Sequence, residues 1–225
     1  MLIIFDLDDT LIDTSAYLTP SKLQKILAGM INEGYFLGGS TQALEDLLYF
    51  NKTESSSGVA LKRFSEQYGI DSKRCAVALK ELYDTLPDPG SVRPVSGAME
   101  VLQELSKEGA LAVVSIGNEE QQLFKLEKAG IPLSLFYKIF VLEEKNKKKY
   151  YLLLIEEMKI DPKQVIVCGD RISIDLIPAK EIGCCTVHME RGRGLNEPSS
   201  AKEQVDFSIK ELSELVEICA KIRNR

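Results

Sequence analysis

Histidine is almost absent from this sequence, and its scarcity narrows the chemistry that the chain can perform. The 225 residues include one histidine, no tryptophan and five cysteines without a CxxC pair. A multi-histidine metal site is therefore impossible, and neither a zinc site nor a disulfide framework is indicated. Any Ser-His-Asp triad would have to use His188, but no GxSxG motif accompanies it, so we expect a structural role. Carboxylates, lysines and hydroxyls remain to carry a reaction.

Excess positive charge and long apolar runs are also missing. The formal net charge is −6, which does not favour a phosphate-backbone partner. No apolar run approaches the roughly 20 residues that span a bilayer. The first residues lack the positive region and the cleavage site of a signal peptide. We therefore expect no nucleic-acid partner, no membrane attachment and a reduced, cytoplasmic location.

Apolar runs alternate with helical patterns over most of the chain. Runs typical of buried strands lie at 2–7, 111–115, 139–142, 165–168 and 184–188. Helical periodicity lies at 98–107, 119–128, 148–159, 174–182 and 209–222. This alternation predicts an α/β fold with a Rossmann-like, doubly wound parallel sheet. Such sheets bind ligands beyond the carboxyl ends of their strands.

Residues 15–87 interrupt this alternation. They show helical patterns and no convincing strand, at 21–33, 41–50, 58–68 and 72–85. The sequence Pro87-Asp88-Pro89-Gly90 then marks a turn before the sheet pattern resumes. The sequence therefore predicts a catalytic core made of residues 1–14 and 88–225, with residues 15–87 inserted as a helical cap domain.

Carboxylates follow two of the predicted strands. Asp6 and Asp8 stand two residues apart after the first strand, so extended geometry projects both toward one side. Asp170 and Asp175 follow the fourth strand, where Gly169 permits a tight turn. Each pair alone could form turns or helix caps. If the two strands are neighbours, the four carboxylates converge, and Mg²⁺ would relieve their repulsion.

These motifs resemble those of the haloacid dehalogenase-like hydrolase superfamily, over nearly the whole chain. The family's DxDxT motif is matched by Asp6-Leu7-Asp8-Asp9-Thr10, and its second motif by the serine of Val113-Val114-Ser115-Ile116-Gly117-Asn118. A lysine follows the third strand in the family, and an acidic motif follows the fourth, matched by Gly169-Asp170 and Asp175. The helical insert is similar to the family's small cap.

The resemblance implies a magnesium-dependent phosphatase that hydrolyses a small organic phosphate monoester through an aspartyl-phosphate. Asp6 would be the nucleophile. Asp8 would protonate the leaving oxygen and then deprotonate the attacking water. Ser115 would donate a hydrogen bond to the phosphoryl group. Four lysines lie within 143–149, and Lys145 falls where the family's lysine lies; we expect the others to form a solvated helix face.

The resemblance also implies a ligand set for Mg²⁺. The ligands would be the carboxylates of Asp6 and Asp170 and the backbone carbonyl of Asp8. Asp175 would support this shell, orient the lysine or bind the metal directly. Further substrate contacts would come from the motif residues Thr10, Ile116, Gly117 and Asn118.

Several alternatives remain open at this point. Asp8 favours phosphate-ester hydrolysis over dehalogenation, because a departing alkoxide needs a proton and a halide does not. A sugar-phosphate mutase would use the same residues. A non-catalytic metal-binding module on the same fold would usually have lost one of them, and all are present. A receiver-type switch protein would lack the helical insert.

Overall fold

A computed structural model describes residues 1–35, 39–144 and 146–223. The chain divides into two compact units, one made of Met1–Thr14 with Val92–Arg225 and the other of Ser15–Ser91. The sequence prediction placed the second boundary a few residues earlier, between residues 87 and 88. No helix within the described ranges combines the length and the apolar character needed to cross a membrane. All five cysteines are free thiols.

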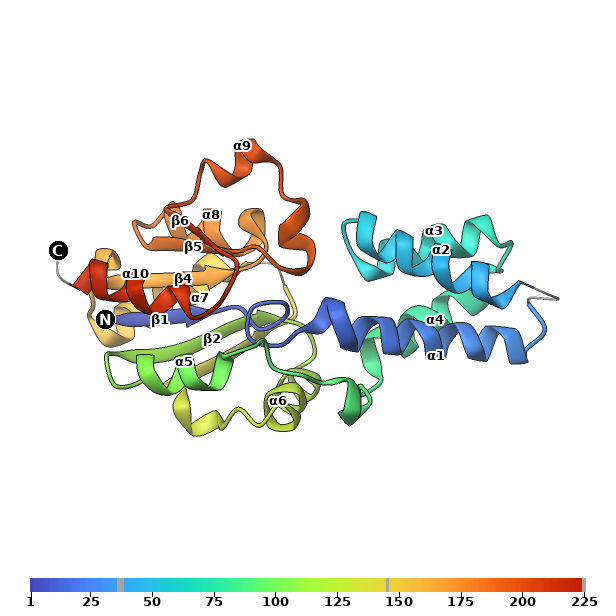
Figure 1. The fold of residues 1–225 in the computed structure, drawn as a ribbon, viewed down its shortest axis with the longest axis horizontal. Coiled ribbons are helices and arrows are strands. Elements are labelled where there is room, and N and C mark those ends of the chain that lie inside the picture. The colour runs from blue at the N-terminus through green and yellow to red at the C-terminus, as the bar shows by residue number, and fades with distance from the viewer. Residues whose placement is uncertain (36–38, 145, 224–225) are drawn as a thin grey trace. The chain divides into compact units, whose positions relative to one another are not determined.

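A parallel β-sheet forms the centre of the first unit (Figure 1). Within the described residues it has six strands in the order β3-β2-β1-β4-β5-β6. The strands are β1 (Leu2–Phe5), β2 (Ala110–Ile116), β3 (Lys138–Leu142), β4 (Val165–Gly169), β5 (Cys185–Met189) and β6 (Phe207–Ile209). All neighbouring strands are parallel. The predicted α/β fold class is confirmed.

Both faces of the central strands are buried, which explains why their sequences are apolar without alternation. Leu2 and Ile4 pack into a core cluster with residues of two helices, α7 (Lys147–Met158) and α8 (Ile177–Lys180). The other face is covered by α5 (Ala98–Leu105) and α10 (Glu214–Arg223) (Figure 1). The remaining helices of this unit are α6 (Glu119–Lys128) and the short α9 (Ser199–Lys202).

Strand register brings the first and fourth strands to the same edge. Phe5, the last residue of β1, lies opposite Val113 of β2 and Cys168 of β4. The residues that follow β1 and β4 therefore emerge side by side at the carboxyl ends of adjacent strands. This adjacency is the condition under which the sequence analysis expected the two acidic pairs to converge.

Two predicted helices differ from the structure. The pattern at 209–222 contains the end of an edge strand, because Phe207–Ile209 pairs with β5 and the helix begins only at Glu214. The pattern at 174–182 is a π-helical turn over Ile172–Leu176 followed by α8. Pro178 stands in the first turn of α8, where its missing N–H costs no helical hydrogen bond.

The second unit consists of helices. They are α1 (Thr19–Asn32), α2 (Ser40–Thr53), α3 (Ser57–Gln67) and α4 (Ser72–Asp84). The Asp71 carboxylate caps α4 by accepting hydrogen bonds from the amides of Lys73 and Arg74 at 2.9 and 3.0 Å. Leucine, isoleucine and phenylalanine side chains from all four helices form one buried cluster. This unit therefore has a hydrophobic core of its own.

Candidate active site

The loop after β1 turns the chain sharply and leaves Asp6 at the end of the strand. The Asp6 amide donates to the carbonyl of Cys168 at 2.9 Å, which keeps this residue beside β4. The Leu7 carbonyl then accepts a hydrogen bond from the amide of Ile12 at 2.9 Å. Asp9 takes the left-handed conformation, with φ of 58°, which aspartate tolerates better than most residues. The Asp6 side chain is only 5% exposed.

The turn after β4 places the second acidic pair. A Cβ atom on Gly169 would lie 2.7 Å from Oδ2 of Asp175, so a side chain at position 169 would collide with that carboxylate. The same Oδ2 accepts a hydrogen bond from the amide of Arg171 at 2.9 Å. His188, fully buried on β5, donates from Nε2 to the backbone carbonyl of Asp170 at 3.0 Å. His188 therefore has a partner that the sequence did not reveal.

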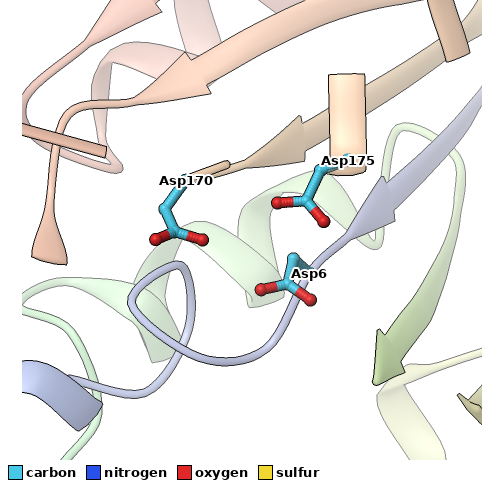
Figure 2. A group of neighbouring side chains, drawn as sticks. All are labelled: Asp6, Asp170 and Asp175. Atoms are coloured by element: carbon cyan, nitrogen blue, oxygen red, sulfur yellow. The ribbon is translucent and has the colours of Figure 1, made fainter. Parts of the chain in front are cut away.

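Three carboxylates meet at this edge of the sheet (Figure 2). One oxygen each from Asp6, Asp170 and Asp175 lies within 4.8 Å of the others, and all three side chains are buried. Burial raises the pKa of Asp6 to about 6; the Lys147 ammonium opposes this shift, and the carboxylates of Asp175 and Asp8 add to it. Burial, reinforced by Asp175 and Asp6, also holds the pKa of Asp170 well above its usual range.

Lys147 is the lysine that the described structure places in this cluster. Its ammonium lies 2.6 Å from Oδ1 of Asp6 and 2.6 Å from Oδ1 of Asp175, and its side chain is fully buried. Burial would lower the pKa of Lys147, but the carboxylates of Asp175 and Asp6 raise it, so the ammonium stays charged. The expectation that Lys147 belongs to a solvated helix face is wrong. Lys145 lies outside the described residues.

Asp8 points to a different set of partners. The Lys125 ammonium lies 2.7 Å from its Oδ1 and 3.0 Å from its Oδ2. The Thr14 hydroxyl donates to Oδ1, and the Gln122 amide donates to Oδ2 at 3.1 Å. Burial would raise the pKa of Asp8, but the charge and hydrogen bonds of Lys125, with those of Thr14 and Gln122, lower it to about 2. Asp8 is therefore held ionised at neutral pH.

The end of β2 places Ser115 beside α6. Ser115 is 1% exposed, and its Oγ accepts a hydrogen bond from Nε2 of Gln122 at 2.9 Å, which leaves the hydroxyl hydrogen free to donate. The Gly117 amide already donates to the carbonyl of Leu142 at 2.8 Å. The Asn118 side chain caps α6 through the amide of Gln121 at 3.1 Å.

The other two residues expected to contact substrate are Thr10 and Ile116. Thr10 is fully buried, and its hydroxyl has no hydrogen-bond partner among the described residues. The Ile116 carbonyl accepts a hydrogen bond from Gln122 Nε2 at 3.0 Å. A substrate role for Thr10, Ile116, Gly117 and Asn118 therefore stays a prediction.

The acidic cluster fits a divalent cation on charge and ligand chemistry. Three carboxyl groups face one ammonium, so ionisation of all three would leave an excess of about two negative charges, which is costly in a poorly solvated site unless a cation is bound. Lys147 forms ion pairs with Asp6 and Asp175 but not with Asp170. Carboxylate oxygens are the ligands that hard cations such as Mg²⁺ prefer. Asp6 and Asp170 would hold the ion, while Asp175 is already bound to Lys147 and the Arg171 amide.

We expect metal affinity to weaken as the pH falls through about 6. The raised pKa of Asp6 means that its carboxyl holds a proton below about 6 in the metal-free protein. A metal ligand must be ionised, so protons and metal compete for Asp6, and affinity should rise with pH and then level off. Titration of the apoprotein with Mn²⁺ at about pH 5 and about pH 8 measures this. Equal affinity at both would contradict it.

The most informative residues that the sequence analysis missed are Lys147, Lys125 and Gln122. Lys147 stands within the lysine run that was considered, but its phase on α7 decides that it points inward. Lys125 and Gln122 stand three residues apart on α6, so they share one helix face, and both are buried. Their burial is known only from the structure, and nothing in the sequence named Asp8 as their partner.

Comparison with known proteins adds a family and several relatives. The family model for haloacid dehalogenase-like hydrolases matches residues 1–183. The glyceraldehyde 3-phosphate phosphatase of Pyrococcus furiosus is 28% identical over 96% of this chain and 92% of its own length. The enzyme with the same name from Methanocaldococcus jannaschii is 25% identical over 98% of this chain and 97% of its own length.

Solved structures show the same fold. The HAD-hydrolase YfnB of Bacillus subtilis, solved bound to magnesium, superposes with a TM-score of 0.72 and covers 97% of each chain. Its sequence is 19% identical to this one, so the likeness concerns the fold.

Proposed function

Because this chain belongs to the haloacid dehalogenase-like hydrolase family, we propose that it hydrolyses a small organic phosphate monoester through an aspartyl-phosphate on Asp6. One observation carries the proposal. Asp6, buried at the end of the central strand, is held by the Lys147 ammonium within a cluster of carboxylates, and Asp8 stands two residues away. The loop after β1 thus supplies a nucleophile and a proton carrier, and the first residue of α7 supplies a fixed cation.

The chain's own residues account for the steps of such a reaction. An Asp6 oxygen attacks phosphorus, and the bond from phosphorus to the leaving oxygen breaks. Asp8, ionised in the free protein, takes up a proton from solvent before it gives one to that oxygen, and it later takes a proton from the water that hydrolyses the aspartyl-phosphate. Ser115 donates its hydroxyl to a phosphoryl oxygen, and Lys147 neutralises charge beside Asp6. The proposed Mg²⁺, held by Asp6 and Asp170, would draw charge from the phosphoryl oxygens.

Sequence relatives support a short phosphorylated substrate. The two described above are named glyceraldehyde 3-phosphate phosphatases, and each aligns over nearly its full length. We therefore extend the proposal to three-carbon phosphates of this type. The helical unit, Ser15–Ser91, is proposed as the cap domain, and a cytoplasmic location remains a prediction.

A panel of phosphate monoesters, including glyceraldehyde 3-phosphate, tests this function. We expect inorganic phosphate to be released with Mg²⁺ present, and release to fall to the background rate after treatment with a chelator, because the acidic cluster then loses its counter-ion. Adding Mg²⁺ back should restore it. A mutase would instead return a phosphorylated isomer without net phosphate release. If no ester in the panel released phosphate, a non-catalytic metal-binding module would be favoured.

A further inference from the structure

The carboxylate of Asp8 is bound by two side chains of one helix. Lys125 contacts both Asp8 oxygens, at 2.7 and 3.0 Å, and Gln122 donates to Oδ2 at 3.1 Å. The two side chains stand three residues apart on α6, so one helix face presents both. Lys125 is 9% exposed at its side chain, against 30% for Asp8.

The orientation of the Gln122 amide is determined by its surroundings. Its nitrogen faces three acceptors: Oδ2 of Asp8 at 3.1 Å, Oγ of Ser115 at 2.9 Å and the Ile116 carbonyl at 3.0 Å. A carboxylate and a carbonyl can only accept, so the NH₂ group must point toward them. One nitrogen therefore ties Asp8 to Ser115, and both oxygens stay within two hydrogen-bond lengths of each other.

This link fixes where the Asp8 carboxylate can point. Ser115 is the group proposed to contact the phosphoryl oxygens. An Asp8 oxygen held near the Ser115 hydroxyl is therefore also near the proposed position of the phosphoryl group. A free aspartate rotates about two side-chain dihedrals, whereas this one is restrained at both oxygens. Proton transfer depends on such placement, because the donor must be within hydrogen-bond reach of the leaving oxygen.

We propose that Lys125 and Gln122 are positioning residues that aim Asp8 at the leaving oxygen. The inference rests on the proposed function, since it assigns a role within that reaction. Neither residue would touch the substrate or the metal. Their contribution to kcat/KM should therefore be large for esters whose leaving group needs a proton and small for esters whose leaving group does not.

Two substrates separate this role from a structural one. The alkoxide leaving from glycerol 3-phosphate needs protonation, whereas the nitrophenolate leaving from 4-nitrophenyl phosphate is stable without it. In the Lys125→Met variant, we expect kcat/KM to fall by about 100-fold or more for the alkyl ester, because positioned proton transfer contributes roughly 10²–10⁴-fold. Loss of the Lys125 charge alone would favour protonation of Asp8, so a fall for the alkyl ester reports lost positioning. For the aryl ester, the loss should stay below about 5-fold. An unfolded fraction cancels from the ratio of the two values.

Matched variants make the result decisive. Lys128 stands on the same helix and pairs with Glu127 near the surface. Its replacement by methionine (Lys128→Met) should not change the ratio of kcat/KM for the two esters. Gln122→Met should change the ratio in the same direction as Lys125→Met, and it carries the test if the latter does not fold. Equal losses for both esters, or a gain for the alkyl ester, would overturn the inference while the phosphatase function stands. A wild-type enzyme inactive toward both esters would instead count against the function.

Discussion

Replacing Asp6 with asparagine is expected to abolish phosphatase turnover while leaving the protein folded. Asparagine has nearly the same shape but cannot attack phosphorus as a carboxylate does, so kcat should fall on the order of 10⁵-fold or more. The change also removes one of three crowded negative charges, and Lys147 keeps Asp175 as a partner. We therefore expect the melting temperature of the metal-free protein to stay level or rise.

Comparison of phosphate release with thermal unfolding checks this expectation. Asp13→Asn is a suitable control, because Asp13 follows in the same loop and pairs with Arg191 at 2.8 Å rather than with the acidic cluster. It should retain turnover within a few-fold of wild type. If Asp6→Asn kept substantial activity in purified protein, the aspartyl-phosphate mechanism would have to be abandoned.

Replacing Lys147 with methionine should produce the second large effect, on stability as well as on activity. Methionine fills much of the same volume but leaves Asp6 and Asp175 without their shared ammonium. Breaking a buried pair by removing one partner typically costs about 3–5 kcal/mol of folding free energy. Denaturant unfolding without metal at neutral pH measures this loss, and phosphate release should fall because Asp6 is no longer held ionised.

Neighbouring lysines provide the controls for Lys147. Lys148 pairs with Glu181 at the surface, and Lys148→Met should change the unfolding free energy by no more than about 1 kcal/mol. Lys145→Met compares the two candidates directly, because the sequence analysis named Lys145 and the described contacts support Lys147. If Lys145→Met lost most phosphate release while Lys147→Met kept wild-type stability and activity, Lys145 would be the lysine that acts beside Asp6.

The sheet was predictable because its signals are local. The runs at 111–115 and 165–168 are apolar without alternation, as strands buried on both faces must be, and they became β2 and β4. The pattern at 119–128 coincides with α6. Prediction failed at Phe207–Ile209, where three residues form an edge strand only because β5 is available to pair with them. A strand this short carries no periodicity of its own.

The acidic residues were also predictable, whereas their partners were not. Aspartates at strand ends can be read from the sequence, and parallel strands bring their carboxyl ends to one edge. The partner of Asp8, by contrast, stands 117 residues away on α6. The lysine beside Asp6 depends on how α7 docks, because each residue turns a helix by about 100°, so among adjacent lysines only one faces inward.

By itself, the sequence determined the α/β fold class, the helical insert and the acidic residues at the strand ends, because periodicity and turn chemistry are properties of short segments. Tertiary structure alone decided which cation faces Asp6, which side chains hold Asp8 and what binds the Asp170 carbonyl. Those contacts join elements far apart in the chain, and their free energies depend on burial and charge that exist only after the elements have packed.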